Sequence, residues 1–130
     1  MTLLLDSTQL EVALTASERA MAFRKRNVTV DRSHIERVQL TDDAWTWLRG
    51  VPNPGLQVPG VVAMGTWQSA GGTDFVLVRR RRPAVVVDLD GDPEFQRLVL
   101  TTRHGLALVR ALRLDVEDVA SDVADLVDRV

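Results

Sequence analysis

Clustered basic side chains are the residues of this sequence best suited to binding a charged ligand. One cluster is Arg24-Lys25-Arg26 and the other is Arg79-Arg80-Arg81-Arg82, and each is expected where one strand leads into the next. Guanidinium groups bind phosphate through paired, charge-assisted hydrogen bonds, so both connections are candidate anion-binding sites. The alternative is two solvated turns whose charges discourage edge-to-edge association of sheets. The candidate anion-binding residues are Arg24, Lys25, Arg26, Arg79, Arg80, Arg81 and Arg82.

Two other groupings have the residue types of an enzyme or metal site but not the required spacing. Ser33 and His34 are adjacent, and neighbours in a turn rarely form the nucleophile and base of acyl transfer. The acidic segment 88–94 has its glycine misplaced for a calcium loop, and Val99 stands where the closing glutamate belongs. His104 has no second histidine at metal-ligating spacing, and cysteine is absent. We therefore expect no catalytic residue, no metal and no cofactor.

The tryptophans mark a segment that is rich in proline and glycine. Residues 50–73 carry no charge over 24 positions, yet three prolines and six glycines among them exclude a membrane helix. We expect a water-exposed excursion from Gly50 to Gly60 that leads into a buried strand containing Trp67. On a helix Trp45 and Trp47 would point about 200° apart, so one is expected to pack inward and the other to face a partner. The alternative is that both cover the open end of a barrel. The candidate partner-binding residues here are Trp45, Trp47, Arg49 and Pro54.

Length and composition indicate a single globular domain. The chain has 130 residues, of which 45% are hydrophobic and 26% charged. Its first residues lack the basic region and the apolar core of a signal peptide, so a cytoplasmic location is expected. We also expect no transmembrane segment and no nucleic-acid partner. Residues 1–113 carry 15 basic and 12 acidic side chains, whereas residues 114–130 carry one basic and six acidic ones. The body is therefore mildly basic and the tail acidic.

Alternation of apolar and polar residues predicts a mainly β protein. Apolar side chains at every second position are typical of half-buried strands, and Gly, Pro or Asp clusters separate the predicted strands as turns. Asp42 and Asp43 can cap a short helix that ends at Leu48. The later strands have the spacing of a meander. The predicted strands are 8–15, one containing Met21 and Phe23, one at Val28 and Val30, one at Val38 and Leu40, and then 61–67, 73–79, 84–89 and 95–101.

Helical spacing is confined to the C-terminal part. Leu106, Val109 and Leu112 follow Thr101 or Thr102, either of which can be the N-cap. A second helix is predicted to begin at Asp115 and to extend the domain of residues 1–114 by residues 115–130. The apolar stripe of this acidic helix can pack on its own domain, or it can dock on a second subunit or another protein. The candidate contact residues are Val116, Val119, Val123 and Leu126.

Several short segments share a pattern with one known family. They are Ser33-His34-Ile35-Glu36-Arg37-Val38, Trp47-Leu48-Arg49-Gly50, Pro54-Gly55, Pro59-Gly60, Gly65-Thr66, Phe75, residues 82–89 and residues 95–99. With strands followed by a helix, they resemble the bacterial pleckstrin-homology-like domains of actinobacteria. The resemblance implies an antiparallel β-sandwich or partly open barrel, closed at one end by a helix and without enzymatic activity. Eukaryotic relatives hold inositol phosphates on basic strand-end loops, which points to the same two basic clusters.

Two features depart from the family pattern. The family's helix typically opens with Asp-Pro, whereas this chain has Thr102-Arg103-His104-Gly105. The predicted helix after residue 114 is an addition. The function favoured by the sequence is a non-catalytic interaction module that binds a protein partner or assembles with itself. The alternative is an adaptor for anions or a membrane surface that uses the arginine clusters at the strand ends.

Overall fold

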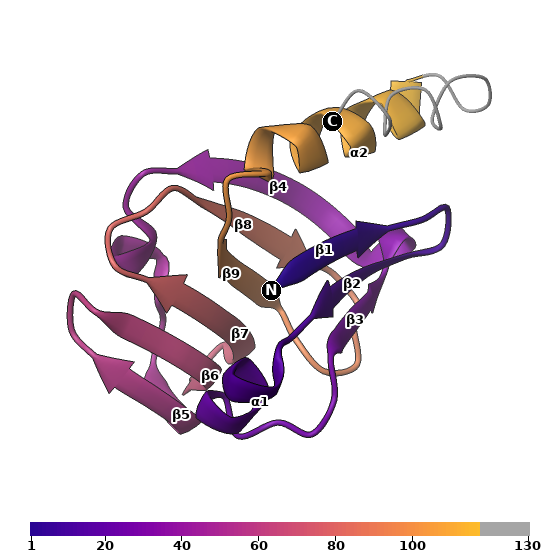
Figure 1. Ribbon diagram of the computed structural model, residues 1–130. Helices are drawn as coiled ribbons and strands as arrows, with labels where there is room; N and C mark the ends of the chain where they lie inside the picture. Colours follow the sequence, from indigo (N-terminus) through magenta and orange to yellow (C-terminus); the bar gives the residue numbers. More distant parts are fainter. Residues whose placement is uncertain (118–130) are drawn as a thin grey trace.

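Figure 1 shows a computed structural model of the protein, which describes residues 1–117 and the side chains of residues 1–112. Strands dominate the described part, together with two α-helices and two short 3-10 helices. The elements are β1 Thr2–Leu5, β2 Gln9–Ala13, α1 Ala16–Met21, β3 Val28–Asp31, η1 Arg32–His34, β4 Ile35–Thr41, η2 Ala44–Trp47, β5 Val51–Val58, β6 Val62–Ser69, β7 Gly72–Arg79, β8 Ala84–Leu89, β9 Arg97–Thr101 and α2 Gly105–Glu117.

The strands form two sheets. A small antiparallel sheet has the order β1-β2-β3, and a larger one has the order β4-β8-β9-β7-β6-β5. The small sheet and α2 cover one face of the large sheet (Figure 1). The predicted mainly β sandwich with a C-terminal helix is therefore confirmed, and the large sheet is not closed into a barrel.

The middle of the large sheet is buried on both faces. Along β7, Phe75 and Leu77 belong to the core between the sheets, whereas Val76 and Val78 belong to a second cluster on the opposite face. Trp67, which is 1% exposed, lies in this second cluster, so its predicted place in the core is confirmed. Such runs of apolar residues mark strands in the interior of a sheet.

The predicted meander is wrong at one point. Strand β9 lies between β7 and β8 and is parallel to β7, with Phe75 opposite Leu98 and Val76 opposite Val99. It is antiparallel to β8. An apolar run shows that a strand is buried but carries no information about its neighbours, and three such runs fill the centre of this sheet. The spacing along the chain therefore predicted the strands but not their order.

The predicted strand at Met21 and Phe23 is also wrong, because Ala16–Met21 form helix α1. The hydroxyl of Thr15 accepts a hydrogen bond from the Glu18 amide at 3.2 Å, and the Glu18 carboxylate accepts one from the Thr15 amide at 2.8 Å. This reciprocal pair is a capping box, which fixes the first turn of a helix. Strand β1, which was not predicted, pairs with β2.

The proline- and glycine-rich excursion forms an edge strand and not a loop. Residues Val51–Val58 pair with β6 as β5, with a cis Asn53–Pro54 bond and a shift in register between Pro52 and Gly55. Proline is tolerated here because an edge strand needs backbone donors on one side alone. The short helix before it is η2, and the side chain of Asp43 makes no capping bond, contrary to the prediction.

Helix α2 continues through the predicted boundary at Asp115. It runs from Gly105 to Glu117, so Asp115 is an interior residue and not an N-cap. Asp costs a helix interior less than Gly and far less than Pro, and neither of those residues interrupts this segment. Thr101 belongs to β9, and the hydroxyl of Thr102 accepts a hydrogen bond from the His104 amide at 3.0 Å. The predicted contact residues Val119, Val123 and Leu126 lie outside the described residues. Within residues 1–117 no helix combines the length and the apolar character needed to cross a bilayer.

Two glycines provide a test of how tightly β5 packs on β6. Gly65 has φ +131°, and an added Cβ would lie 2.6 Å from both the Gly55 Cα and the Pro54 carbonyl oxygen. Gly60 has φ +76°, but an added Cβ would meet no atom within 4 Å. We expect Gly65→Ala to lower the free energy of unfolding by about 3 kcal/mol or more and Gly60→Ala by about 1 kcal/mol. Urea denaturation measures both, and equal losses would contradict this packing.

Candidate functional site

The turn between β7 and β8 presents three exposed arginines, and we call residues 80–82 the arginine turn. Arg80 has φ +52°, a left-handed conformation that is uncommon for a residue with a side chain. Its amide donates a hydrogen bond to the Val61 carbonyl at 2.8 Å, and its carbonyl accepts one from the Trp45 indole at 2.8 Å. These bonds hold the backbone of the arginine turn while its side chains face solvent.

A second exposed feature lies beside the arginine turn. The β5–β6 turn, residues 58–61, is closed by a hydrogen bond from the Val61 amide to the Val58 carbonyl at 2.9 Å. Val58 and Val61 are 43% and 46% exposed. We call residues 58–61 the valine turn. The Arg80–Val61 hydrogen bond places this apolar turn directly against the arginine turn.

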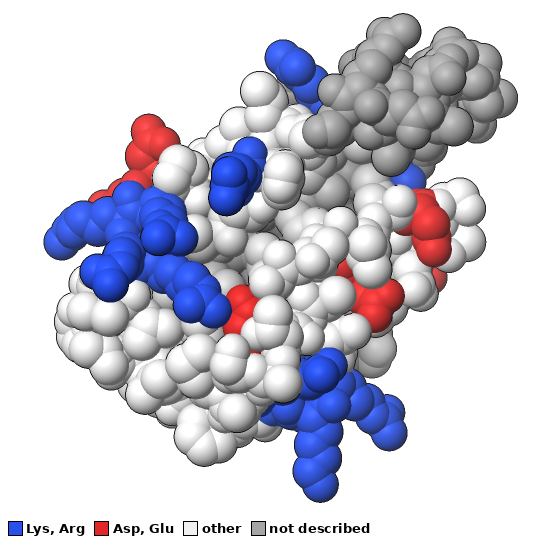
Figure 2. Space-filling view, viewed as in Figure 1, with Lys and Arg blue, Asp and Glu red and all other residues white. Residues whose placement is uncertain are grey.

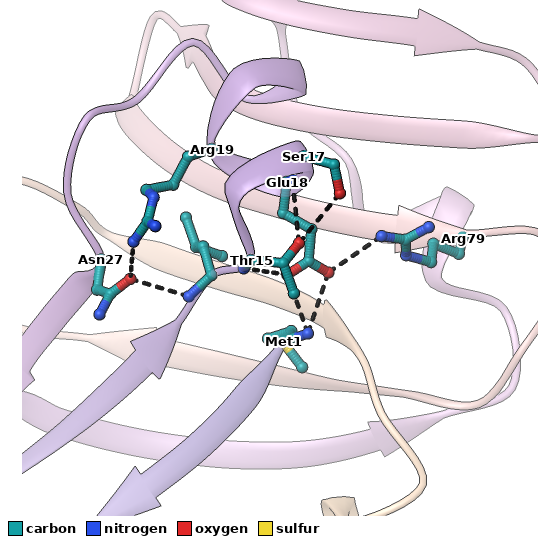
Figure 3. A network of polar contacts seen from close by, with 8 residues as sticks. Met1, Thr15, Ser17, Glu18, Arg19, Asn27 and Arg79 are labelled. Atoms are coloured by element: carbon teal, nitrogen blue, oxygen red, sulfur yellow. Dashed lines mark hydrogen bonds and ion pairs between the residues drawn. The ribbon is translucent and has the colours of Figure 1, made fainter.

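Arg79 precedes the arginine turn but is part of a buried polar network (Figure 3). Its guanidinium lies 3.1 Å from the carboxylate of Glu18, a side chain that is 2% exposed. The amino group of Met1 lies 2.9 Å from the same carboxylate. Burial alone raises the pKa of Glu18, but hydrogen bonds from the Thr15 amide, the Met1 amine and Arg79 outweigh it and lower the pKa to about 2. Arg79 therefore neutralises a buried charge and is less available to a ligand than residues 80–82.

The other predicted basic cluster, Arg24 to Arg26, lies elsewhere on the molecule. Figure 2 shows basic side chains gathered in two separate groups, one at the left by the β7–β8 connection and one at the lower edge below α1. Arg24 is committed to the fold, because it pairs with Glu94 at 3.2 Å and lies over the rings of Phe75 and Phe95. Lys25 and Arg26 are exposed. The seven predicted anion-binding residues do not form one site.

The predicted tryptophan surface consists largely of side chains that have partners within the chain. Trp45 donates to the Arg80 carbonyl, and the ring of Trp47 lies 5.3 Å from the Arg97 guanidinium. Both indoles are half-buried against the second apolar cluster. Arg49 forms two hydrogen bonds, of 2.9 and 2.8 Å, with buried Asp74, and these bonds raise the pKa of Arg49. Pro54 is exposed on β5.

The serine–histidine neighbours do not form a catalytic pair. The hydroxyl of Ser33 donates to the Asp31 carboxylate at 2.8 Å, so its proton is not directed at His34. The Nδ1 atom of His34 is 3.8 Å from the Asp92 carboxylate, beyond hydrogen-bond distance. The described residues also contain no group of three side chains that could hold a metal ion.

Two contributions to this site were missed in the sequence. The Glu18 network is signalled by the Thr15-x-x-Glu18 spacing, which is a capping-box pattern. The exposure of Val58 and Val61 beside the arginine turn has no local signal, because it depends on a contact between turns that lie far apart along the chain.

No family model, no curated protein and no solved structure matches this chain. The resemblance to pleckstrin-homology-like domains therefore stays a prediction.

Glu18 gives the site a defined dependence on pH. Its pKa is lowered from 4.5 to about 2 in the folded state, so its contribution to stability is complete above pH 4.5 and is lost as the pH falls toward 2. Glu18→Gln leaves the Met1 amine and Arg79 without their counter-ion, and we expect it to lower the free energy of unfolding at neutral pH by about 3 kcal/mol. Urea denaturation from pH 2 to 7 should show that the wild-type advantage shrinks below pH 4.5. An advantage independent of pH would contradict the assignment.

Proposed function

We propose that this chain is a non-catalytic domain that docks on anionic membrane surfaces through the arginine turn and the valine turn. The observation that carries the proposal is the 2.8 Å hydrogen bond from the Arg80 amide to the Val61 carbonyl. It joins three exposed guanidinium groups to two exposed apolar side chains on one edge of the molecule.

The two turns would contribute to membrane binding in different ways. Each arginine near an anionic lipid surface contributes about 1 kcal/mol of attraction, which weakens as salt screens it. Apolar side chains that enter the boundary between headgroups and acyl chains add a contribution that is insensitive to salt. Neither contribution is large alone, so the proposal depends on their combination in one place.

The structure gives less support to a protein partner bound through Trp45 and Trp47. Both indoles already contact the protein itself, and Arg49 is paired with Asp74. A tryptophan that serves as a binding hot spot must bury its surface in the partner, and most of the surface of Trp45 and Trp47 is already covered here. The protein-partner hypothesis and self-assembly stay predictions from the sequence.

Sedimentation with lipid vesicles tests the proposal. The protein should sediment with phosphatidylcholine vesicles that contain about one-third phosphatidylglycerol and not with pure phosphatidylcholine. Arg80→Glu with Arg81→Glu should weaken the partition by at least about tenfold, because attraction becomes repulsion. Val58→Ser with Val61→Ser should weaken it several-fold and leave its dependence on salt unchanged.

The exposed pair Lys25 and Arg26 is the matched control, since Lys25→Glu with Arg26→Glu changes the net charge by the same amount elsewhere on the surface. This control should retain most of the binding. Equal losses of vesicle binding in the two charge-reversal variants would show that general electrostatic attraction, and not the arginine turn, accounts for the sedimentation. Absence of sedimentation with anionic vesicles would overturn the proposal, and a protein captured by the Trp45 and Trp47 surface would then be the better account.

A further inference from the structure

Two neighbouring cavities lie where β1, the end of β9 and the start of α2 meet. One has a volume of about 430 Å³ and the other of about 340 Å³. Both are lined by Met1, Thr102 and His104, so they adjoin at these residues. Each volume falls within or near the range of small-molecule sites in proteins.

The first cavity is basic. Its lining includes three arginines and the amino-terminal residue, against the carboxylate of Glu18. Glu18 is already neutralised by the Met1 amine and Arg79. Arg82 and Arg103 are exposed at its margin, and their guanidinium groups have no hydrogen-bond partner or ion pair among the described residues. The cavity therefore has an excess of positive charge and unused donors, which suits a carboxylate or a phosphate.

The second cavity is apolar. Leu3 and Leu5 from β1 face Ala107, Leu108 and Ala111 from α2 across it. Leu108 and Ala111 are buried, and Leu3 and Leu5 pack against the core between the sheets. The small side chains Ala107 and Ala111 leave the space open that a larger residue would fill. Each methylene of an alkyl chain that is removed from water in this position strengthens binding about three- to fourfold.

We infer that the joined cavities bind one molecule of a single-chain amphiphile with an anionic headgroup, a carboxylate or a phosphate monoester. The headgroup lies against Arg82 and Arg103, and the alkyl chain lies between β1 and the first turns of α2. Charge complementarity at one end and apolar walls at the other select this ligand over a small anion or a neutral alkane. This site does not depend on membrane docking, although Arg82 also belongs to the arginine turn, so the test uses Arg103 and Ala107.

Binding of soluble amphiphiles to the full chain tests the inference. Decanoate and decyl phosphate, both kept below the concentration at which they form micelles, should bind saturably at one molecule per chain in isothermal titration calorimetry. Octanoate should bind about tenfold more weakly than decanoate, because it lacks two methylenes. Inorganic phosphate has the anionic group without an alkyl chain, and decyl maltoside has the alkyl chain without an anionic group. Each should bind at least about tenfold more weakly than decyl phosphate. Competition of an acidic lysophospholipid with decanoate would identify membrane lipid as a source of the ligand. Binding of decanoate without such competition would identify a free fatty acid as the type of ligand.

Two variants and one control locate the site. Ala107→Trp should fill the apolar cavity and weaken decanoate binding by at least about tenfold without altering vesicle sedimentation. Arg103→Glu should weaken it similarly, whereas Arg110→Glu, an exposed position on the same helix outside the cavity lining, should not. Circular dichroism and urea denaturation establish that each variant is folded.

Absence of saturable decanoate and decyl phosphate binding would overturn the inference, as would binding that Ala107→Trp and Arg103→Glu both leave unchanged. Inorganic phosphate that binds as tightly as decyl phosphate would also overturn it, since the apolar cavity would then contribute nothing. Failure of vesicle sedimentation with retained decanoate binding would refute membrane docking alone.

Discussion

The carboxylate of Glu18 joins parts of the chain that lie far apart in the sequence. It joins the start of β1 through the Met1 amine, the first turn of α1 through Thr15, and the end of β7 through Arg79 (Figure 3). A buried charge of this kind is tolerated only when it is paired and its hydrogen bonds are satisfied, and three partners provide this. The small sheet is thereby fixed relative to the strand that leads into the arginine turn.

The four consecutive arginines have different environments because of this arrangement. Arg79 faces the buried carboxylate, Arg80 is anchored by its backbone between η2 and the valine turn, and Arg82 lies at the margin of the basic cavity. Adjacent side chains in a turn point in different directions, so a run of identical residues does not imply one common role. The position of each side chain, and not the local density of charge, determines that Arg79 has a structural role while its neighbours are available to a ligand.

Local sequence signals could predict most strands but not how they are arranged. Alternation and apolar runs located β6, β7 and β8 closely, because burial on a sheet leaves a direct pattern. Helix α1 has a local signal in the Thr15-x-x-Glu18 spacing, whereas the alternation at Met21 and Phe23 led to the prediction of a strand. The place of β9 between β7 and β8 has no such signal, because it depends on pairing between distant segments. The arginines of the candidate site could be found from the sequence, whereas the adjoining valines and cavities arise from tertiary contacts alone.

The central place of β9 also bears on how the chain reaches its folded state. During synthesis β7 and β8 leave the ribosome before β9. Until β9 pairs with them, each of these two strands has one unpaired edge and exposed apolar side chains. Such edges are templates for association with other chains, and pairing between distant segments is slow to form. A polypeptide that ends before residue 97 would lack the strand that joins the two halves of the large sheet. Completion of this sheet is therefore a late event, and incomplete chains are the species most exposed to aggregation.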